Sequence, residues 1–185
     1  DPTSGKTILV YKGNNAGGIS PSSKNFGCQT LTVNSNSLSL GSYAHIEFNL
    51  GSGSYMNENS LTYDSGIGKI VCIYPLRQSS SSNDANVKVA VFTVSGTSIS
   101  FGSESVFESG NTAYIEPVFD SNENKVVIFY ADVDDSYYPK AVVGTVSSTS
   151  ISFGSIVTIN SGQATSMAAA FDSSVNKTVC AFGGG

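Results

Sequence analysis

The chain has 185 residues, a formal net charge of −5 and a charged-residue content of only 12%. Its nine basic residues are spread without a cluster, which excludes a phosphate-neutralising nucleic-acid surface and argues against attraction to anionic membranes. No apolar run approaches the roughly twenty residues of a membrane-spanning helix. We therefore predict a protein with no nucleic-acid partner and no membrane insertion, kept soluble mainly by Ser, Thr, Asn and Gly.

One signature occurs four times along the chain: an Asp, four turn-forming residues, a Lys, and an apolar run that ends in an aromatic residue. A second signature, SLSLGS or SISFGS, keeps the same order at residues 37–42, 98–103 and 150–155. Two motifs that recur together every 50–60 residues or so indicate an internal repeat. The Asp and Lys residues of the first signature are predicted to be structural markers of a turn: Asp1 and Lys6, Asp64 and Lys69, Asp120 and Lys125, and Asp172 and Lys177.

Each copy is predicted to contain four strands, which we name A to D. In the third copy they cover residues 112–120, 125–132, 140–146 and 149–159. The C–D turn has two residues, Ser147 and Ser148, which predicts a tight antiparallel hairpin. Strand B is apolar on both faces over residues 126–130, so we expect it to be covered on both sides. Strand D alternates, as expected for a strand with one wet face.

The strand pattern predicts an all-β fold of tandem four-stranded antiparallel blades, arranged like those of a β-propeller. Residues 1–55 supply strands B-C-D, residues 56–110 and 111–162 supply complete blades, and residues 163–185 supply strands A-B. Residues 164–171 have helical propensity, but the repeat overrides it and predicts a strand. Because strand B is present at both ends, we expect a stretch of a longer array, or a unit that is repeated in a polymer, more than a complete closed ring.

The copies differ mainly in the loop between strands B and C, which covers residues 12–27, 75–86 and 131–139. Length variation between fixed strands places these loops on the surface. Since they occupy equivalent points of successive blades, they should gather on one rim. That rim is where we expect binding to vary.

The densest carboxylates, Asp132, Asp134 and Asp135, lie in the third of these loops. Hard oxygen ligands at alternate positions could hold Ca²⁺. The cluster lacks the Gly and the distal Glu of an EF-hand loop, and the other copies lack it altogether. We interpret it as a solvated acidic loop, keep Ca²⁺ as the alternative, and predict no other metal and no cofactor.

Tyr137 and Tyr138 follow in the same loop and are candidates for stacking on sugar faces, against ordinary packing at a blade edge. Asn176 begins an N-glycosylation sequon, although its place at the start of a strand B makes access doubtful. The single histidine, His45, lies in a strand D and has no nucleophile signature to work with. We predict no catalytic residue and no enzymatic activity.

The three cysteines, Cys28, Cys72 and Cys180, are too far apart in sequence for a metal cluster. The last two occupy a repeat position that holds Leu9 and Ile128 in the other copies. A position shared by Leu, Ile and Cys is a core position. We therefore predict buried free thiols and no disulfide framework.

The segments SISFGS, DSNENKVVIFY and AVVGTVS resemble the propeller-like repeats of marine phage tail-fibre and virion-surface proteins and of related environmental exported proteins. The resemblance covers nearly the whole chain and is strongest over residues 94–158. It implies a structural or host-attachment role at an extracellular or virion surface. The partners expected from it are further copies or the remainder of a longer chain, with cell-surface glycans as a candidate ligand.

Two functions are compatible with these patterns. The first is a non-enzymatic structural and adhesive module of a fibre or appendage, which presents its variable loops to a cell surface or to neighbouring subunits. The second is a carbohydrate-binding or carbohydrate-processing propeller with its site outside this stretch. Hydrolysis needs a pair of carboxylates, and apart from the turn Asp only Glu116 lies within a predicted strand A. The first function is favoured.

Overall fold

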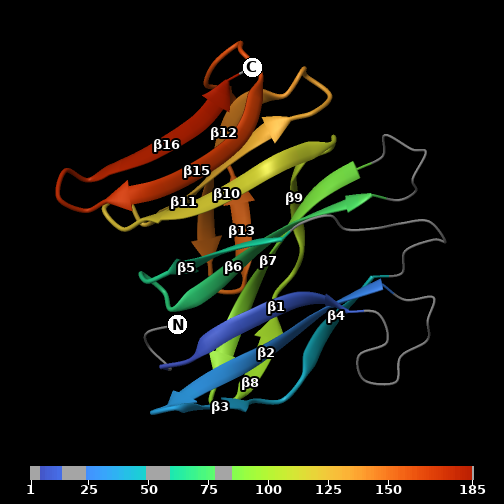
Figure 1. The fold of residues 1–185 in the computed structure, drawn as a ribbon, viewed down its shortest axis with the longest axis vertical. Coiled ribbons are helices and arrows are strands. Elements are labelled where there is room, and N and C mark those ends of the chain that lie inside the picture. The colour runs from blue at the N-terminus through green and yellow to red at the C-terminus, as the bar shows by residue number, and fades with distance from the viewer. Residues whose placement is uncertain (1–4, 14–23, 49–58, 78–84, 185) are drawn as a thin grey trace.

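The computed structural model describes residues 5–13, 24–48, 59–77 and 85–184, and over these ranges the chain forms β-strands and no helix. None of these ranges therefore contains a helix long and apolar enough to cross a membrane. The strands form four antiparallel sheets that follow one another in chain order (Figure 1).

Sheet 1 contains β1 (Thr7–Gly13), β2 (Lys24–Asn34), β3 (Ser37–Leu40) and β4 (Ala44–Phe48). Sheet 2 contains β5 (Ser60–Asp64), β6 (Lys69–Arg77), β7 (Ala85–Ser95), β8 (Ser98–Phe101) and β9 (Ser105–Glu108). Sheet 3 contains β10 (Thr112–Asp120), β11 (Lys125–Asp132), β12 (Tyr138–Ser147), β13 (Ser150–Phe153) and β14 (Val157–Thr158), and sheet 4 contains β15 (Ala164–Asp172) and β16 (Lys177–Gly184).

Sheets 2 and 3 have the predicted strand order A-B-C-D, as β5-β6-β7-β8 and β10-β11-β12-β13. Sheet 1 holds the equivalents of B, C and D, and sheet 4 those of A and B. The predicted bounds of strands A and B in the third copy coincide with β10 and β11. Residues 164–172 are a strand, as the repeat predicts and local propensity does not. The prediction of an all-β, antiparallel fold is confirmed.

Strand D differs from the prediction of one continuous strand, because it is broken into two short strands in each complete copy. In sheet 2 both β8 and β9 pair with β7. The break falls at Gly102, where a Cβ atom would lie 1.8 Å from the carbonyl oxygen of Thr149 in the next sheet. The strand also breaks after β13, at Gly154, where a Cβ atom would meet only the Val143 carbonyl oxygen, at 3.8 Å. The break is therefore a feature of the repeat and not a result of the close approach of the next sheet.

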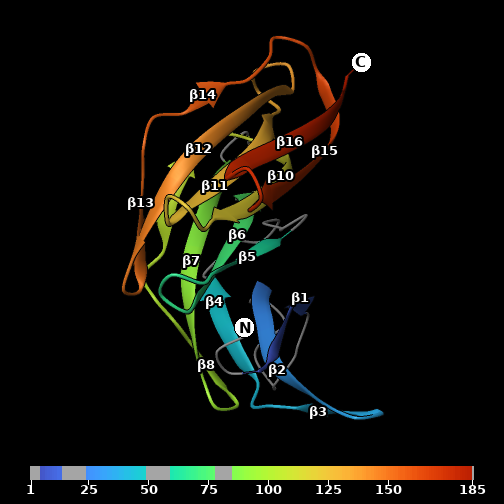
Figure 2. The same ribbon diagram turned by 90° about the vertical axis from the view of Figure 1, so that its left-hand side faces the viewer.

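The four sheets are stacked face to face, and Figure 2 shows them one above another from sheet 1 to sheet 4. One apolar core lies between sheets 1 and 2 and includes Cys28, Cys72 and Phe92. A second core lies between sheets 2 and 3 and includes Val71 and Ile128. Sheet 2 therefore contributes its two faces to two different cores.

Strand B of sheet 2 shows the consequence of this stacking. Residues 70–74 of β6 are all buried, with exposed fractions from 0% to 5%. Ile70, Cys72 and Tyr74 point to one core, and Val71 and Ile73 point to the other. In sheet 3 the same run, residues 126–130, is buried except for the half-buried Val127. The predicted covering of strand B on both faces is confirmed.

Candidate functional site

The signature Asp closes the A–B turn in the way its residue type predicts. The Asp64 Oδ1 atom accepts hydrogen bonds from the amides of Gly66 (2.9 Å) and Ile67 (3.3 Å). The equivalent Asp120 oxygen accepts from the amides of Asn122 and Glu123, each at 3.0 Å. An Asp that satisfies the amides two and three residues ahead is typical of such turns.

Asp172 makes the same turn in sheet 4, where its Oδ1 atom accepts from the amide (2.9 Å) and the hydroxyl (2.6 Å) of Ser174. These hydrogen bonds, that of the hydroxyl first, lower the pKa of the Asp172 carboxyl below its ordinary value. Asp64, Asp120 and Asp172 are therefore turn residues, as predicted. Asp1 lies outside the described residues.

The signature Lys has a partner that the sequence analysis missed. Lys6, Lys69 and Lys125 each donate from Nζ to a threonine hydroxyl of strand C, at 2.7, 2.8 and 2.9 Å. The acceptors are Thr32, Thr93 and Thr145. A Thr-Val pair at residues 32–33, 93–94 and 145–146 was the available signal. The Lys thus joins strand B to strand C next to the turn.

The residue before each Lys has a left-handed backbone. Its φ angle is +63° at Gly5, +65° at Gly68 and +54° at both Asn124 and Asn176. Gly and Asn are the residues that adopt this conformation most readily, so Asn176 is explained by its turn. Asn176 is exposed, and the expectation that strand B would restrict access to its sequon is wrong.

The acidic loop is a hydrogen-bonded turn in which Asp134 and Asp135 are exposed, as expected of a solvated loop, and Asp132 is buried. Asp132 is only 8% exposed, and its Oδ1 atom accepts from the amides of Asp134 (3.1 Å) and Asp135 (3.2 Å). Lys140 donates to the carboxylates of Asp132 (2.7 Å) and Asp135 (2.8 Å). Burial opposes the charge of Lys140, but these two carboxylates outweigh it and raise its pKa above the ordinary value.

Asp134 has a different partner. Its two carboxylate oxygens accept from the amide (2.8 Å) and the side-chain Nδ2 (3.0 Å) of Asn111. Lys140 therefore bridges Asp132 and Asp135, while Asp134 accepts from Asn111. Over the described ranges, His, Cys, Asp and Glu side chains nowhere gather in a group of three or more suited to a metal ion. The arrangement fixes the B–C loop of sheet 3 against the start of β10.

Tyr137 and Tyr138 end this loop and are both half-buried. Tyr137 has a φ angle of +60°, and its carbonyl accepts the Ala164 amide at 2.9 Å, at the start of β15. Tyr138 pairs with Asp132 where β11 and β12 begin to separate. Both tyrosines are therefore part of the folded loop as well as accessible from outside.

A second set of tyrosines, at the end of the apolar run of strand B, makes polar contacts that the sequence pattern does not reveal. Tyr74 donates to Glu104, which also pairs with Lys88, and Tyr130 donates to Glu108 at 2.9 Å. Burial first, and then the hydrogen bond to the glutamate, raises the pKa of Tyr74 and of Tyr130. Buried tyrosines paired in this way are structural, because the carboxylate satisfies the hydroxyl in the core.

Cys28 and Cys72 are buried free thiols, as predicted, and Cys180 is a free thiol but only half-buried. Burial raises the pKa of Cys28 to about 12, which disfavours the reactive thiolate. His45 lies in β4, as a strand residue, and its side chain is outside the described part.

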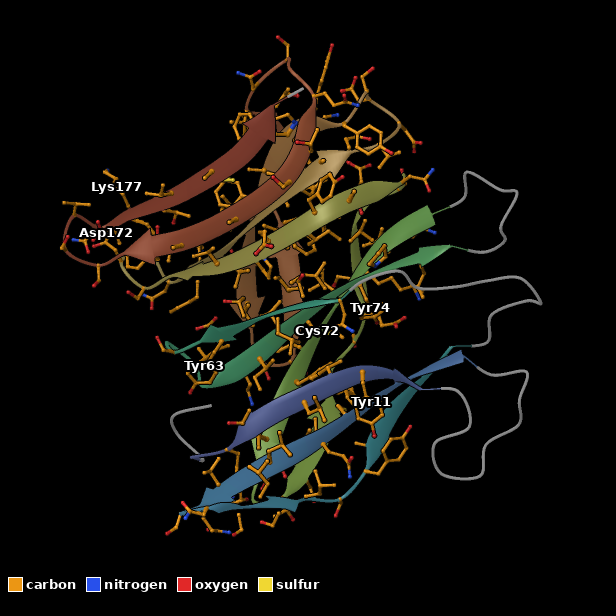
Figure 3. The ribbon with its side chains drawn as sticks, in the orientation of Figure 1. Tyr11, Tyr63, Cys72, Tyr74, Asp172 and Lys177 are labelled. Carbon is orange, nitrogen blue, oxygen red and sulfur yellow. The ribbon has the colours of Figure 1, made fainter. Side chains whose placement is uncertain are left out.

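The two ends of the sheets carry different features. The A–B turns of sheets 2, 3 and 4 lie at the left in Figure 1, and Figure 3 shows Asp172 and Lys177 together at one of them. The B–C loops leave from the other ends of the same strands, where Gly13 is paired with Asn25, Arg77 with Ala85, and Asp132 with Tyr138. We call this edge of the stack the loop edge.

Comparisons of this chain with known protein families, curated proteins and solved structures found no match.

Proposed function

We propose that the protein is a non-enzymatic structural and adhesive module, in which stacked propeller-like blades hold a row of variable loops at the loop edge. In this proposal each sheet is one blade, and sheets 1, 2 and 3 each present one B–C loop. The support is geometric: three B–C strand pairs of fixed register open at the same edge, while the segments between them, 14–23, 78–84 and 133–137, differ in length. A rigid scaffold with varied loops at one edge is the arrangement of many binding proteins.

The interior supports a scaffold role. In the two cores the B strands are packed by Val, Ile, Cys and Tyr side chains, and the buried tyrosine hydroxyls are satisfied by glutamates. The signature Asp and Lys residues are engaged in turn and cross-strand hydrogen bonds. The residues that recur in the repeat therefore stabilise the fold. In this proposal the loops bind the ligand.

The setting we propose is an extracellular fibre or virus appendage. A surface of hydroxyl and amide groups with 12% charged residues and free, buried thiols at Cys28 and Cys72 is compatible with it. The resemblance of the repeat to phage tail-fibre and virion-surface proteins points the same way. Cell-surface glycans are the ligand class we favour, because the described loop places Tyr137 and Tyr138 beside polar groups.

The experiment is a glycan-array screen of the purified chain, followed by titration of the strongest glycan. The loop variant is Tyr137→Asn, which removes the aromatic ring and keeps a residue that tolerates the left-handed backbone. The matched control is Ile67→Ser in the A–B turn of sheet 2, where the side chain is 44% exposed. We expect the loop variant to weaken binding at least tenfold and the turn variant to leave it unchanged.

Four outcomes contradict the proposal. If both variants lose glycan affinity equally, or if only the turn variant loses it, the binding site lies away from the loop edge. Release of free sugar from a bound glycan supports the carbohydrate-processing function instead. A chain that binds neither a glycan nor intact cells has no adhesive role.

A further inference from the structure

Among the described residues, sheet 1 has no counterpart of the strand A that sheets 2, 3 and 4 hold. β6 and β11 are each paired on both edges, whereas among the described residues β1 pairs only with β2. Beside the other edge of β1 lies a groove of about 270 Å³, lined by Thr7 and Ile8 of β1 and by Leu61, Thr62, Tyr63 and Ile70 of sheet 2. Figure 3 shows Tyr63 on this side of sheet 2. The groove is smaller than the roughly 300–1,000 Å³ of small-molecule pockets.

The repeat shows what belongs in this groove. Strand A of each later sheet packs on strand A of the sheet before it, so that β10 lies on β5 and β15 lies on β10. The groove in front of β5 and beside β1 is the equivalent place for sheet 1. Its natural occupant is therefore a strand of type A.

The two outer faces of the stack are uncovered at matching positions. Leu38 of β3 is 67% exposed, whereas its equivalents Ile99 and Ile151 are 8% and 5% exposed because they face the preceding sheet. On the opposite face, Val143 of β12 is 44% exposed, whereas the equivalent Val91 of β7 is fully buried by the next sheet. Ile151 and Val91 belong to the same core, so Leu38 and Val143 are the matching halves of one such contact.

A second pair of side chains shows the same match between the two uncovered faces. Between sheets 2 and 3 the rings of Phe107 and Phe153 are in contact, with centroids 5.3 Å apart. The equivalents of these two residues on the uncovered faces are Ile159, which is 41% exposed, and Leu40, which is 62% exposed. The contact between Phe107 and Phe153 inside the stack thus corresponds to a pair of aliphatic residues, Ile159 and Leu40, that lie on opposite outer faces.

The B strands β1 and β16 are also matched. Both copies have Lys-Thr at the start of strand B, at residues 6–7 and 177–178, whereas the inner copies have Lys-Ile and Lys-Val. The Thr178 hydroxyl donates to the Asp120 carboxylate of the sheet before it, at 3.3 Å, and Thr7 holds the equivalent position in β1. No described side chain of β16 is buried, so little packing holds β16 in place beyond its pairing with β15.

We propose that β15 of one copy pairs with β1 of a second copy, in the place of its own β16, and fills the groove beside β1. The resulting sheet takes strand A from one chain and strands B, C and D from the next. Leu38 and Leu40 of the second copy then cover Val143 and Ile159 of the first. The inference deepens the proposed structural role and rests on it.

The register of the exchanged pair follows from the repeat. β15 pairs with β16 so that Asp172 lies opposite Lys177 and Ala169 opposite Cys180. β1 in the same place puts Asp172 opposite Lys6 and Ala169 opposite Leu9. The contact is head to tail, so it links unlike faces and generates either a ring or an open array.

The first experiment measures assembly of the full chain by sedimentation velocity over a concentration series. We expect the unmodified chain to form oligomers, and Leu38→Lys or Val143→Lys to reduce it to single copies. An equimolar mixture of the two variants should give a 1:1 dimer and nothing larger, since each variant retains one intact face. The matched control is Val175→Lys, which alters a side chain that is 60% exposed in an A–B turn and should assemble as the unmodified chain does.

A chain that stays monomeric at its highest soluble concentration overturns the proposal, as does a folded mixture of the two variants that yields no dimer. Circular dichroism of each variant establishes that it is folded. Assembly that responds to the control as strongly as to Leu38→Lys also overturns it.

The second experiment tests the exchange of strands by disulfide trapping in the variant Leu9→Cys, Ala169→Cys, Cys180→Ser. Paired strand positions lie within the Cα separation that a disulfide needs, so we expect a link between Cys residues of two chains at these positions. Oligomers without this link contradict the exchange. Failure of assembly leaves single-copy glycan binding intact, so it is distinguishable from failure of the adhesive function.

Discussion

Gly102 and Gly154 occupy the same place in successive repeats, each directly after the first half of strand D. A Cβ atom at Gly102 would lie 1.8 Å from the Thr149 carbonyl oxygen, whereas one at Gly154 would meet only the Val143 carbonyl oxygen, at 3.8 Å. The close approach of two backbones is what requires glycine at the first position. At the second position no described sheet of the same chain is present to impose it.

We expect Gly102→Ala to lower the free energy of unfolding by about 1–3 kcal/mol, the usual cost of overpacking. The matched change Gly154→Ala should leave it unchanged or raise it by up to about 1 kcal/mol, through the lower entropy of the unfolded chain. Urea unfolding of dilute protein measures both. Equal losses at the two sites would show that the sheet contact at Gly102 is not what constrains it.

Cys28 gives a prediction for alkaline pH. Burial raises the pKa of its thiol from about 9.0 to about 12 in the folded state. Between these values the folded chain binds more protons than the unfolded chain, so the free energy of unfolding falls as pH rises. Its contribution is fully present below about pH 9 and is lost toward pH 12. Unfolding of Cys28→Val across this range should show a shallower decline than that of the unmodified chain, and an identical slope would contradict the assignment.

At the scale of single elements, the A–B turn can be tested with two copies of one residue. Asp64 is 3% exposed and accepts from two turn amides, whereas Asp172 makes an equivalent turn at an exposed end of the stack. Asp64→Ala leaves these amides without their charged acceptor, and we expect a loss of about 2 kcal/mol. Asp172→Ala should cost clearly less, because water can replace its carboxylate. Thermal unfolding of the two variants decides this, and a larger loss at Asp172 would contradict it.

The sequence pattern predicted the elements that depend on local chemistry. The turn Asp and the doubly apolar strand B follow from residue type and spacing, and β10 and β11 have the predicted bounds. The C–D turn is tight, as predicted, but its two residues are Ser148 and Thr149, one later than predicted, because Ser147 pairs with Ser150. The break in strand D recurs at Gly102 and Gly154, although only Gly102 closely approaches the next sheet, and the alternation of residue types did not reveal it. The Lys69–Thr93 hydrogen bond depends on the register between strands B and C, which the pattern within a single strand does not specify.

The partners of the acidic loop depend on the fold. Asp134 and Asp135 are exposed, as expected of a solvated loop, but Asp132 is buried beside Lys140, eight residues later, where β11 and β12 pair. Asn111, directly before β10, donates to Asp134. Both partners are close in space because of the fold, so composition alone could not assign these carboxylates.

At the scale of the whole molecule, the burial of each strand depends on how many neighbouring sheets cover it. β6 lies between two sheets and is fully buried over residues 70–74. β16 has the same place in the repeat but a face with no described neighbour, and Val179 is 55% exposed where its equivalent Val71 is fully buried. Stability should therefore vary along the stack as a sum of contacts between adjacent sheets, as in repeat proteins.

Hydrogen exchange of the backbone amides tests this claim most directly, in the Val143→Lys variant so that single copies are observed. We predict that the amides of β6 and β11 exchange slowest and that those of β16 exchange at least about tenfold faster, a difference of about 1.4 kcal/mol in opening free energy. The opposite result, with β16 protected as strongly as β6, would show that neighbouring sheets do not set the stability of a strand and would contradict the account.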